Sequence, residues 1–149
     1  MASLCNYTLT EYSNQKFKYW FLFEPDTKQP KLIKDAIENA VCWACCVYPS
    51  DEERNLVIQN LSTKKEFRGN RIGMKLLQKV ARIYQDRVET VTLDDMSDGV
   101  APKNLYFKFG FRIQNNSGRW VKWHETSSIY GPERIIKIDR LVRCNVDLL

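Results

Sequence analysis

The chain has 149 residues, which fits one domain, and its 44% hydrophobic content supplies a core without a metal or disulfide scaffold. Charged residues of both signs are mixed along the sequence, which excludes a disordered or low-complexity chain. The net charge of +5 favours an anionic ligand or partner, such as a phosphate-bearing cofactor, an acidic protein surface or RNA, although a solvated surface explains an excess of this size equally well.

Residues 1–15 do not combine a basic region, an apolar run and a small-residue cleavage site, so they do not form a secretory signal. No apolar run reaches the roughly 18 residues of a membrane span. We therefore expect a cytoplasmic protein without a membrane partner. Five cysteines form an odd set, which favours buried reduced thiols, and the single CxxC of Cys42 and Cys45 lacks a second ligand pair, so we expect no metal site.

The first half of the chain predicts two strands around a helix. The aromatic run at residues 17–23 (FKYWFLF) predicts a strand, and Pro25 and Asp26 mark a turn after it. Apolar residues recur at helical spacing over residues 31–41, which predicts a helix. The apolar run at residues 42–48 predicts the next strand.

A polar turn at residues 49–54 precedes a second apolar run at residues 56–61, which predicts a central strand buried on both faces. The pattern changes to period 3.6 at Arg71 and predicts an amphipathic helix. Its apolar stripe is Ile72, Leu76, Leu77, Val80, Ile83 and Tyr84. Its other face is expected to carry Lys75, Gln78, Lys79 and Arg82.

The β-branched run at residues 88–93 predicts a strand, and its position after a crossover helix favours parallel pairing with the preceding strand. A short helix is expected over residues 102–109, closed by Gly110. Further strands are expected at residues 112–113, 120–124 and 135–141. The order of elements predicts a mixed α/β (α+β) fold in which residues 1–149 form one domain around a twisted mixed sheet flanked by helices.

The stretch Arg68–Gly73 lies where a predicted strand ends and the amphipathic helix begins. Free amides and partial positive charge at a helix start can hold phosphate oxygens. Gly69 and Gly73 let the backbone approach an anion closely, Asn70 can cap the helix, and Arg68 and Arg71 add charge. Helix starts with glycines are also common without a ligand. A nucleotide P-loop is excluded because its lysine and hydroxyl residue do not follow.

This stretch resembles the pyrophosphate-binding signature of the GNAT superfamily of acetyl-CoA-dependent N-acetyltransferases, written Q/R-x-x-G-x-G/A. Arg68 matches the first position and Gly73 the last, whereas Arg71 stands where the middle glycine is expected. The preceding residues are similar to the family's strand-end pattern, in which a leucine and a small β-branched residue come before an aromatic. The matching residues are Leu61, Thr63 and Phe67.

The stretch LYFKFGF at residues 105–111 is similar to the second signature of the family, LYxKxGF. The two signatures occur in the order and at the spacing that the GNAT fold requires, and the resemblance covers residues 56–111. One departure lies at residues 98–100, where Asp-Gly-Val replaces the asparagine that the family often carries ahead of the tyrosine.

The resemblance implies transfer of an acetyl group from acetyl-CoA to a primary amine by direct attack in a ternary complex. It implies that Tyr106 is the general acid toward the coenzyme A thiolate, and that a backbone amide near the bulged strand end holds the thioester oxygen. The residues it assigns to the cofactor are Leu61, Ser62, Thr63, Arg68, Gly69, Asn70, Arg71, Ile72 and Gly73. Without the resemblance, a tyrosine in an aromatic-rich helix, such as Tyr106, is usually a core residue with a satisfied hydroxyl.

The motifs identify neither the general base nor the acceptor. Asp94, Asp95 and Glu66 are candidate bases, and each is as well explained as a solvated carboxylate. The acceptor amine belongs to a small molecule, to a protein or peptide, or to an aminoacyl-tRNA, and the oligomeric state is open. The alternative function is a catalytically silent GNAT-like domain or a basic RNA-binding module whose aromatics stack bases.

Overall fold

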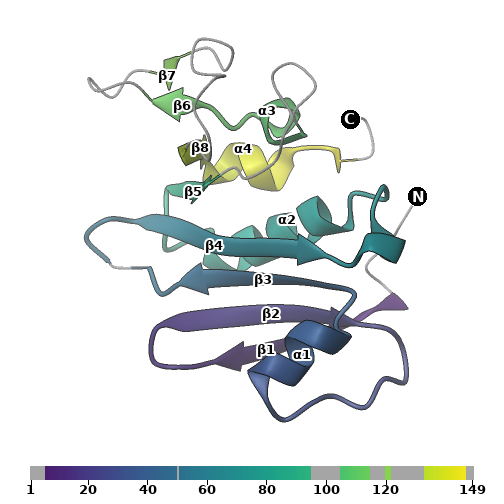
Figure 1. Cartoon of the computed structure of the whole chain (residues 1–149). Coiled ribbons are helices and arrows are strands. Elements are labelled where there is room, and N and C mark those ends of the chain that lie inside the picture. Colours follow the sequence, from purple (N-terminus) through teal and green to yellow (C-terminus); the bar gives the residue numbers. More distant parts are fainter. Residues whose placement is uncertain (1–5, 50, 95–104, 115–119, 122–132, 147–149) are drawn as a thin grey trace.

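A computed structural model describes residues 6–49, 51–94, 105–114, 120–121 and 133–146 (Figure 1). In this part of the chain, a six-stranded sheet has the order β1-β2-β3-β4-β5-β8. Its strands are β1 (Thr8–Ser13), β2 (Phe17–Phe23), β3 (Cys42–Val47), β4 (Asn55–Thr63), β5 (Thr90–Asp94) and β8 (Glu133–Lys137). All neighbours pair antiparallel except β4 and β5, which are parallel as expected for strands joined by a crossover helix. A small second sheet pairs β6 (Ile113–Gln114) with β7 (Trp120–Val121).

Helices pack on both faces of the large sheet. They are α1 (Ile33–Asn39), the 3-10 helix η2 (Lys65–Phe67), α2 (Ile72–Tyr84), α3 (Leu105–Phe109) and α4 (Ile138–Arg143). Helix α1 lies in front of β1 and β2 in Figure 1, and α2 crosses behind β4. The architecture confirms the mixed α/β prediction.

The core has two parts because strand side chains alternate between the faces. Trp20 and Leu22 of β2 join Cys42, Ala44 and the other residues of the larger cluster, beneath α2 and α4. The opposite face of β2 supplies a second cluster, in which Phe21 and Phe23 pack against α1. The aromatic run at residues 17–23 therefore serves both layers.

Strand β1 is an element that the sequence did not predict. It pairs with β2 from Thr8 opposite Phe23 to Ser13 opposite Lys18. The hairpin turn is fixed by Asn14, whose side-chain oxygen accepts hydrogen bonds from the amides of Lys16 and Phe17 at 2.9 and 2.8 Å. The segment TLTEYS has no apolar run because β1 is an edge strand with one partner.

Two predictions about burial were wrong in part. Strand β4 is buried at Leu56 and Ile58 only, whereas residues 59–60 are exposed, so it is not covered on both faces along its length. In α2, Ile83 is 48% exposed, although it was placed on the apolar stripe. Gln78 was placed on the solvent face, but it is only 7% exposed.

The burial of Gln78 has a physical reason in the C-terminal helix. The predicted strand at residues 135–141 is wrong beyond Lys137, since the chain continues as α4, which buries Ile138 and Leu141 at helical spacing. The Gln78 amide donates to the carbonyls of Leu141, Val142 and Cys144 at 3.0, 3.2 and 2.7 Å. The Leu141 carbonyl also accepts from the Cys144 amide at 3.4 Å, and Gln78 supplies the further donor that caps the end of α4 from α2.

We expect Gln78→Leu to lower the free energy of unfolding by about 1–3 kcal/mol, because the carbonyls of Val142 and Cys144 at the end of α4 lose the Gln78 donor. Urea unfolding followed by circular dichroism measures this change. Gln85→Leu, at an exposed position at the end of the same helix, is the matched control and should change stability by less than about 0.5 kcal/mol. Equal effects of the two variants would contradict the capping role.

The cysteines that the structure describes are free thiols. Cys42, Cys45 and Cys46 are buried, as predicted, and Cys144 is half-buried. Burial raises the pKa of Cys42 and of Cys46 to about 11, and the hydrogen bond of Cys42 with Thr63 or of Cys46 with Tyr84 offsets only part of each rise. These thiols are therefore neutral packing groups near neutral pH.

The raised thiol pKa values predict that stability falls with rising pH. Between the ordinary thiol pKa of 9.0 and the folded pKa of about 11, the folded state binds more protons at Cys42 and Cys46 than the unfolded state does. Each thiol should then lower the free energy of unfolding by about 1.4 kcal/mol per pH unit in this window. Denaturation at several pH values tests this, and a Cys42→Ala/Cys46→Ala variant should lose much of the slope. An unchanged slope in that variant would refute the prediction.

Candidate functional site

The turn between β4 and α2 is held by its own backbone and by Arg68. The amide of Phe67 donates to the carbonyl of Lys64 at 2.9 Å, and the amide of Arg68 donates to Lys65 at 3.2 Å. The Arg68 side chain turns back, and its Nε donates to the carbonyl of Thr63 at 3.0 Å. Arg68 therefore ties the turn to the end of β4 while its terminal guanidinium nitrogens stay at the exposed surface.

The amides after this turn are directed outward from a helix start. The hydrogen bond from Lys75 N to Arg71 O, at 3.0 Å, is the first of α2. Within the described chain, the structure gives no hydrogen-bond partner for the amides of residues 69–74. A row of unsatisfied N–H groups at the positive end of a 13-residue helix is suited to an anion.

The two glycines of the turn have different roles. Gly69 has φ +92 and open space around its Cβ position, so the backbone conformation itself favours glycine there. Gly73 has no positive φ, but a Cβ atom would lie 3.2 Å from Thr63 Oγ1 and 3.8 Å from Leu61 Cγ. Gly73 therefore allows α2 to start in close contact with the end of β4.

Arg71 is the N-cap residue of α2 and adopts a left-handed conformation with φ 58. This explains why the signature that the sequence resembles has glycine at this position. A non-glycine residue pays about 1–2 kcal/mol for such a conformation. The expectation that Asn70 caps the helix was wrong, because Arg71 is the N-cap and no side chain caps it.

Beside this turn, β4 and β5 stop pairing. Their parallel register runs from Asn55 opposite Thr90 to Ile58 opposite Leu93, whereas β4 continues to Thr63. The β3–β4 register shifts after Ile58, so residue 59 is an extra residue in β4. The bulge bends β4 where it leaves β5, and it lies at residue 59, before the strand end near Leu61 to Thr63 where it was expected.

Beyond Ile58, the edge of β4 that faced β5 has no strand partner. The alternation of hydrogen bonds along β4 shows which of its amides point to that edge. Lys64 N donates to Val41 O at 3.0 Å across the β3–β4 pair. Alternation along an antiparallel ladder then directs the amide of Ser62 to β3, and the amides of Leu61 and Thr63 to the opposite edge. Two strand amides and the α2 start thus flank the region where β5 has diverged.

The Thr63 side chain belongs to the packing of the fold. Its Oγ1 donates to Cys42 Sγ at 3.3 Å, and the same oxygen lies closest to the Cβ position of Gly73. Among the strand-end residues expected to meet a cofactor, Thr63 therefore offers its backbone. The Leu61 side chain likewise packs against the larger core cluster.

Tyr106 lies on α3 and is half-buried against the same cluster. Its ring meets Phe111 edge-on, with centroids 5.6 Å apart. Phe109 and Phe111 are buried, as expected for packing residues. The predicted end of the helix is confirmed, because Gly110 has φ +116, and a Cβ atom there would collide with the Arg140 side chain.

Of the candidate bases, the structure describes Glu66 and Asp94. Glu66 lies exposed in η2, and Asp94 ends β5 opposite Glu133. Asp95, Asp98 and the expected continuation of the strand at residues 122–124 lie outside the described residues. Among the described residues, no group of three or more His, Cys, Asp or Glu could hold a metal ion, and no helix is long and apolar enough to cross a membrane.

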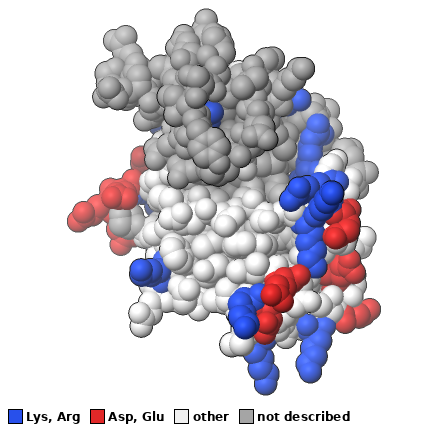
Figure 2. All heavy atoms as spheres, in the orientation of Figure 1, with Lys and Arg blue, Asp and Glu red and all other residues white. Residues whose placement is uncertain are grey.

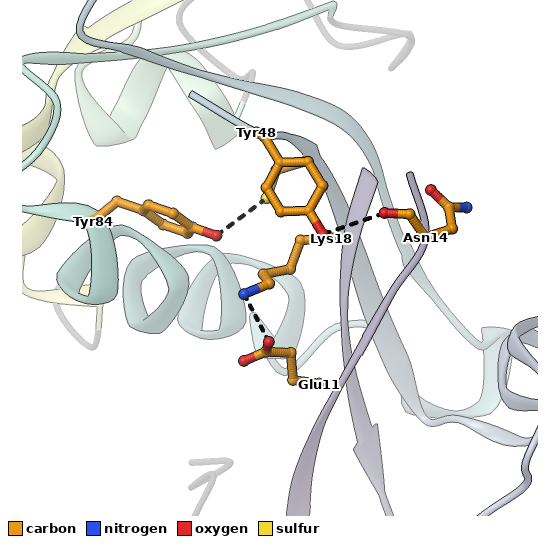
Figure 3. A network of polar contacts seen from close by, with 6 residues as sticks. Glu11, Asn14, Lys18, Tyr48 and Tyr84 are labelled. Carbon is orange, nitrogen blue, oxygen red and sulfur yellow. Dashed lines mark hydrogen bonds and ion pairs between the residues drawn. The ribbon is translucent and has the colours of Figure 1, made fainter. Parts of the chain in front are cut away.

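A polar network at the other end of α2 is structural (Figure 3). Lys18 pairs with Glu11 at 2.7 Å and lies 5.9 Å from the centroid of the Tyr48 ring, whose hydroxyl donates to the carbonyl of Asn14 at 3.3 Å. The Tyr84 hydroxyl accepts a 4.0 Å contact from a buried cysteine thiol, and burial raises its pKa. This network joins the end of α2 to the β1–β3 edge, and no sequence motif indicated it.

The sequence of this chain matches a known protein family. A family model described as an acetyltransferase (GNAT) domain matches residues 32–113, more than half of the chain. The chain therefore belongs to the GNAT acetyltransferases and is an acyltransferase enzyme. No curated protein matches the chain.

Solved structures share the fold at low sequence identity. A GNAT acetyltransferase from Staphylococcus aureus Mu50 is 14% identical with a TM-score of 0.54, and the match covers 82% of this chain and 68% of the other. Tetrahymena GCN5 is 12% identical with a TM-score of 0.56, and the match covers 84% and 70%. A GNAT acetyltransferase from Elizabethkingia anophelis, solved with acetyl-CoA bound, is 15% identical with a TM-score of 0.56, and the match covers 89% and 97%. These likenesses confirm the fold.

Proposed function

We propose that residues 1–149 form one catalytic domain that transfers an acetyl group from acetyl-CoA to a primary amine by direct attack in a ternary complex. The observation that carries this proposal is the row of unpartnered amides at residues 69–74, next to strands that have stopped pairing. A diphosphate needs several donors in a small space, and such a helix start supplies them.

The remaining cofactor contacts follow from the same geometry. The diphosphate of acetyl-CoA would accept hydrogen bonds from the amides of Gly69–Gly73, with the Arg68 and Arg71 guanidinium groups beside it. The pantetheine arm would then run along the free edge of β4. The amides of Leu61 and Thr63 face that edge, so one of them would hold the thioester oxygen as negative charge develops on it.

Tyr106 is the proposed general acid. The amine must attack in its neutral form, and the departing thiolate of coenzyme A must receive a proton. Tyr106 is half-buried on α3 and its ring packs edge-on against Phe111, so its hydroxyl is a well-positioned donor for that proton. The cysteines need no role, because direct transfer forms no covalent enzyme intermediate.

Acetyl-CoA binding provides the first test. Acetyl-CoA should raise the melting temperature, and the rise should grow with the logarithm of its concentration above the Kd, because it binds the folded state preferentially. Release of free coenzyme A during a screen of small amines, peptides and aminoacyl-tRNA would then identify the acceptor. No stabilisation by acetyl-CoA at millimolar concentration would refute the proposed function.

A further inference from the structure

Positive charge is concentrated in one segment of this chain. Residues 64–82 contain seven basic residues and one acidic residue, which gives +6 against +5 for the whole protein, so the rest of the chain sums to −1. The basic residues are Lys64, Lys65, Arg68, Arg71, Lys75, Lys79 and Arg82. By contrast, the face that carries α1 is largely uncharged at its centre (Figure 2).

Four of these cations form a stripe along α2. Arg71, Lys75, Lys79 and Arg82 follow spacings of four, four and three residues, which places them on one side of the helix. The opposite side of α2 is buried in the core. At 1.5 Å per residue the stripe is about 16 Å long, with neighbouring cations about 5–6 Å apart.

The far end of the stripe is free for a ligand. Lys79 and Arg82 are exposed. In the described part of the chain, no ion pair involves Lys79 or Arg82. Lys79 lies about 12 Å along the helix from Arg71, so a diphosphate at the helix start does not reach it.

Helix α4 extends the positive surface. It lies beside α2, joined through Gln78, and it carries exposed Arg140 and Arg143. Burial lowers the pKa of Arg112, and the neighbouring Arg140 lowers it further. The guanidinium groups of Arg112 and Arg140 are therefore close together. An anionic partner would reduce the repulsion between them.

We propose that the cationic surface formed by α2 and α4 binds RNA through its phosphate backbone. This goes beyond the proposed function, because Lys79 and Arg82 lie outside the acetyl-CoA site. A repeating polyanion matches a straight row of cations better than a single small anion does. The one amide side chain of α2, Gln78, is buried, so the polar side chains that α2 can offer a nucleic acid are lysines and arginines, which bind phosphates. Double-stranded RNA is recognised largely by shape and phosphate contacts, without base reading.

Fluorescence anisotropy with a labelled RNA duplex of about 16 base pairs and the full chain tests this inference. Lys79→Glu/Arg82→Glu removes the far end of the stripe. Lys31→Glu/Lys34→Glu is the matched control, because both lysines are exposed at or near α1 on the other face and the net charge falls equally. We expect the α2 variant to bind at least about 10-fold more weakly, with a salt slope reduced by about 2, and the control to change by less than about 2-fold.

Comparator ligands decide the class of partner. Polyglutamate, anionic phospholipid vesicles and a DNA duplex of the same sequence should each bind more weakly than the RNA. Absence of RNA binding, equal losses in the two double variants, or equal or tighter binding of any comparator would overturn the inference. Stabilisation by acetyl-CoA, measured on the same variants, should be unchanged. That readout verifies folding and reports separately on the proposed function.

Discussion

Arg71→Glu should weaken acetyl-CoA binding by about 100-fold, which corresponds to roughly 2.7 kcal/mol. The substitution removes a cation beside the proposed diphosphate site and places a carboxylate against the amides that would hold it. The left-handed backbone is equally strained with either side chain, so the change isolates the charge. Isothermal titration calorimetry with acetyl-CoA measures the effect.

Two further variants separate charge from conformation. Arg82→Glu makes the same charge change on an exposed part of the same helix, and it should change acetyl-CoA affinity by less than about 2-fold. Arg71→Gly should raise the free energy of unfolding by about 1 kcal/mol, because it relieves the left-handed conformation, and should weaken binding less than Arg71→Glu does. If Arg82→Glu weakens binding as much as Arg71→Glu, the diphosphate site is wrongly placed.

Tyr106→Phe should lower kcat by about 100-fold and leave acetyl-CoA affinity nearly unchanged. The variant keeps the ring that meets Phe111, so packing on α3 is preserved while the proton donor is lost. Single-turnover assays that follow free coenzyme A, combined with calorimetry, separate chemistry from binding.

Tyr48→Phe is the matched control for loss of a tyrosine hydroxyl. Tyr48 is exposed and lies in the network at the opposite end of α2, so its kcat should equal that of the unmodified protein (Figure 3). Parallel losses of affinity and turnover in Tyr106→Phe would mean that this residue has a packing role, as its aromatic surroundings also allow.

Most elements of the fold were predictable because they are strongly patterned. The aromatic run of β2, the apolar run of β3 and the 3.6-residue period of α2 are local signals, and each produced the expected element. The parallel pairing of β4 and β5 followed from the order of the elements. Only their ends differed by a few residues, as for α1, which begins at Ile33 and ends at Asn39.

The errors arose where distant contacts decide local structure. Strand β1 forms because β2 offers it a partner, and its own polar sequence gives no signal. Ile135–Leu141 has the residues of a strand, but its last part becomes α4 because Ile138 and Leu141 pack on the core and Gln78 caps the helix end. A buried glutamine on a helix cannot be recognised without knowing which carbonyls it meets.

The turn between β4 and α2 was predictable in its location but not in its details, and its use as a cofactor site stays a prediction. The glycines and arginines of residues 68–73 identified the turn, and the resemblance named a cofactor for it. The left-handed Arg71, the packing role of Gly73 and the inward Thr63 hydroxyl depend on how β4 meets α2 in space. The positive net charge comes from residues 64–82, so it describes one surface of the protein and does not identify the amine acceptor.

Amide chemical shifts of ¹⁵N-labelled protein, recorded during titration with acetyl-CoA, test the central claim most directly. We expect the largest shifts at residues 69–74, with further shifts at Leu61 and Thr63, because the hydrogen-bond partners of these amides change from water to phosphate or thioester oxygens. Saturable binding that leaves these amides unshifted and perturbs another surface would contradict it.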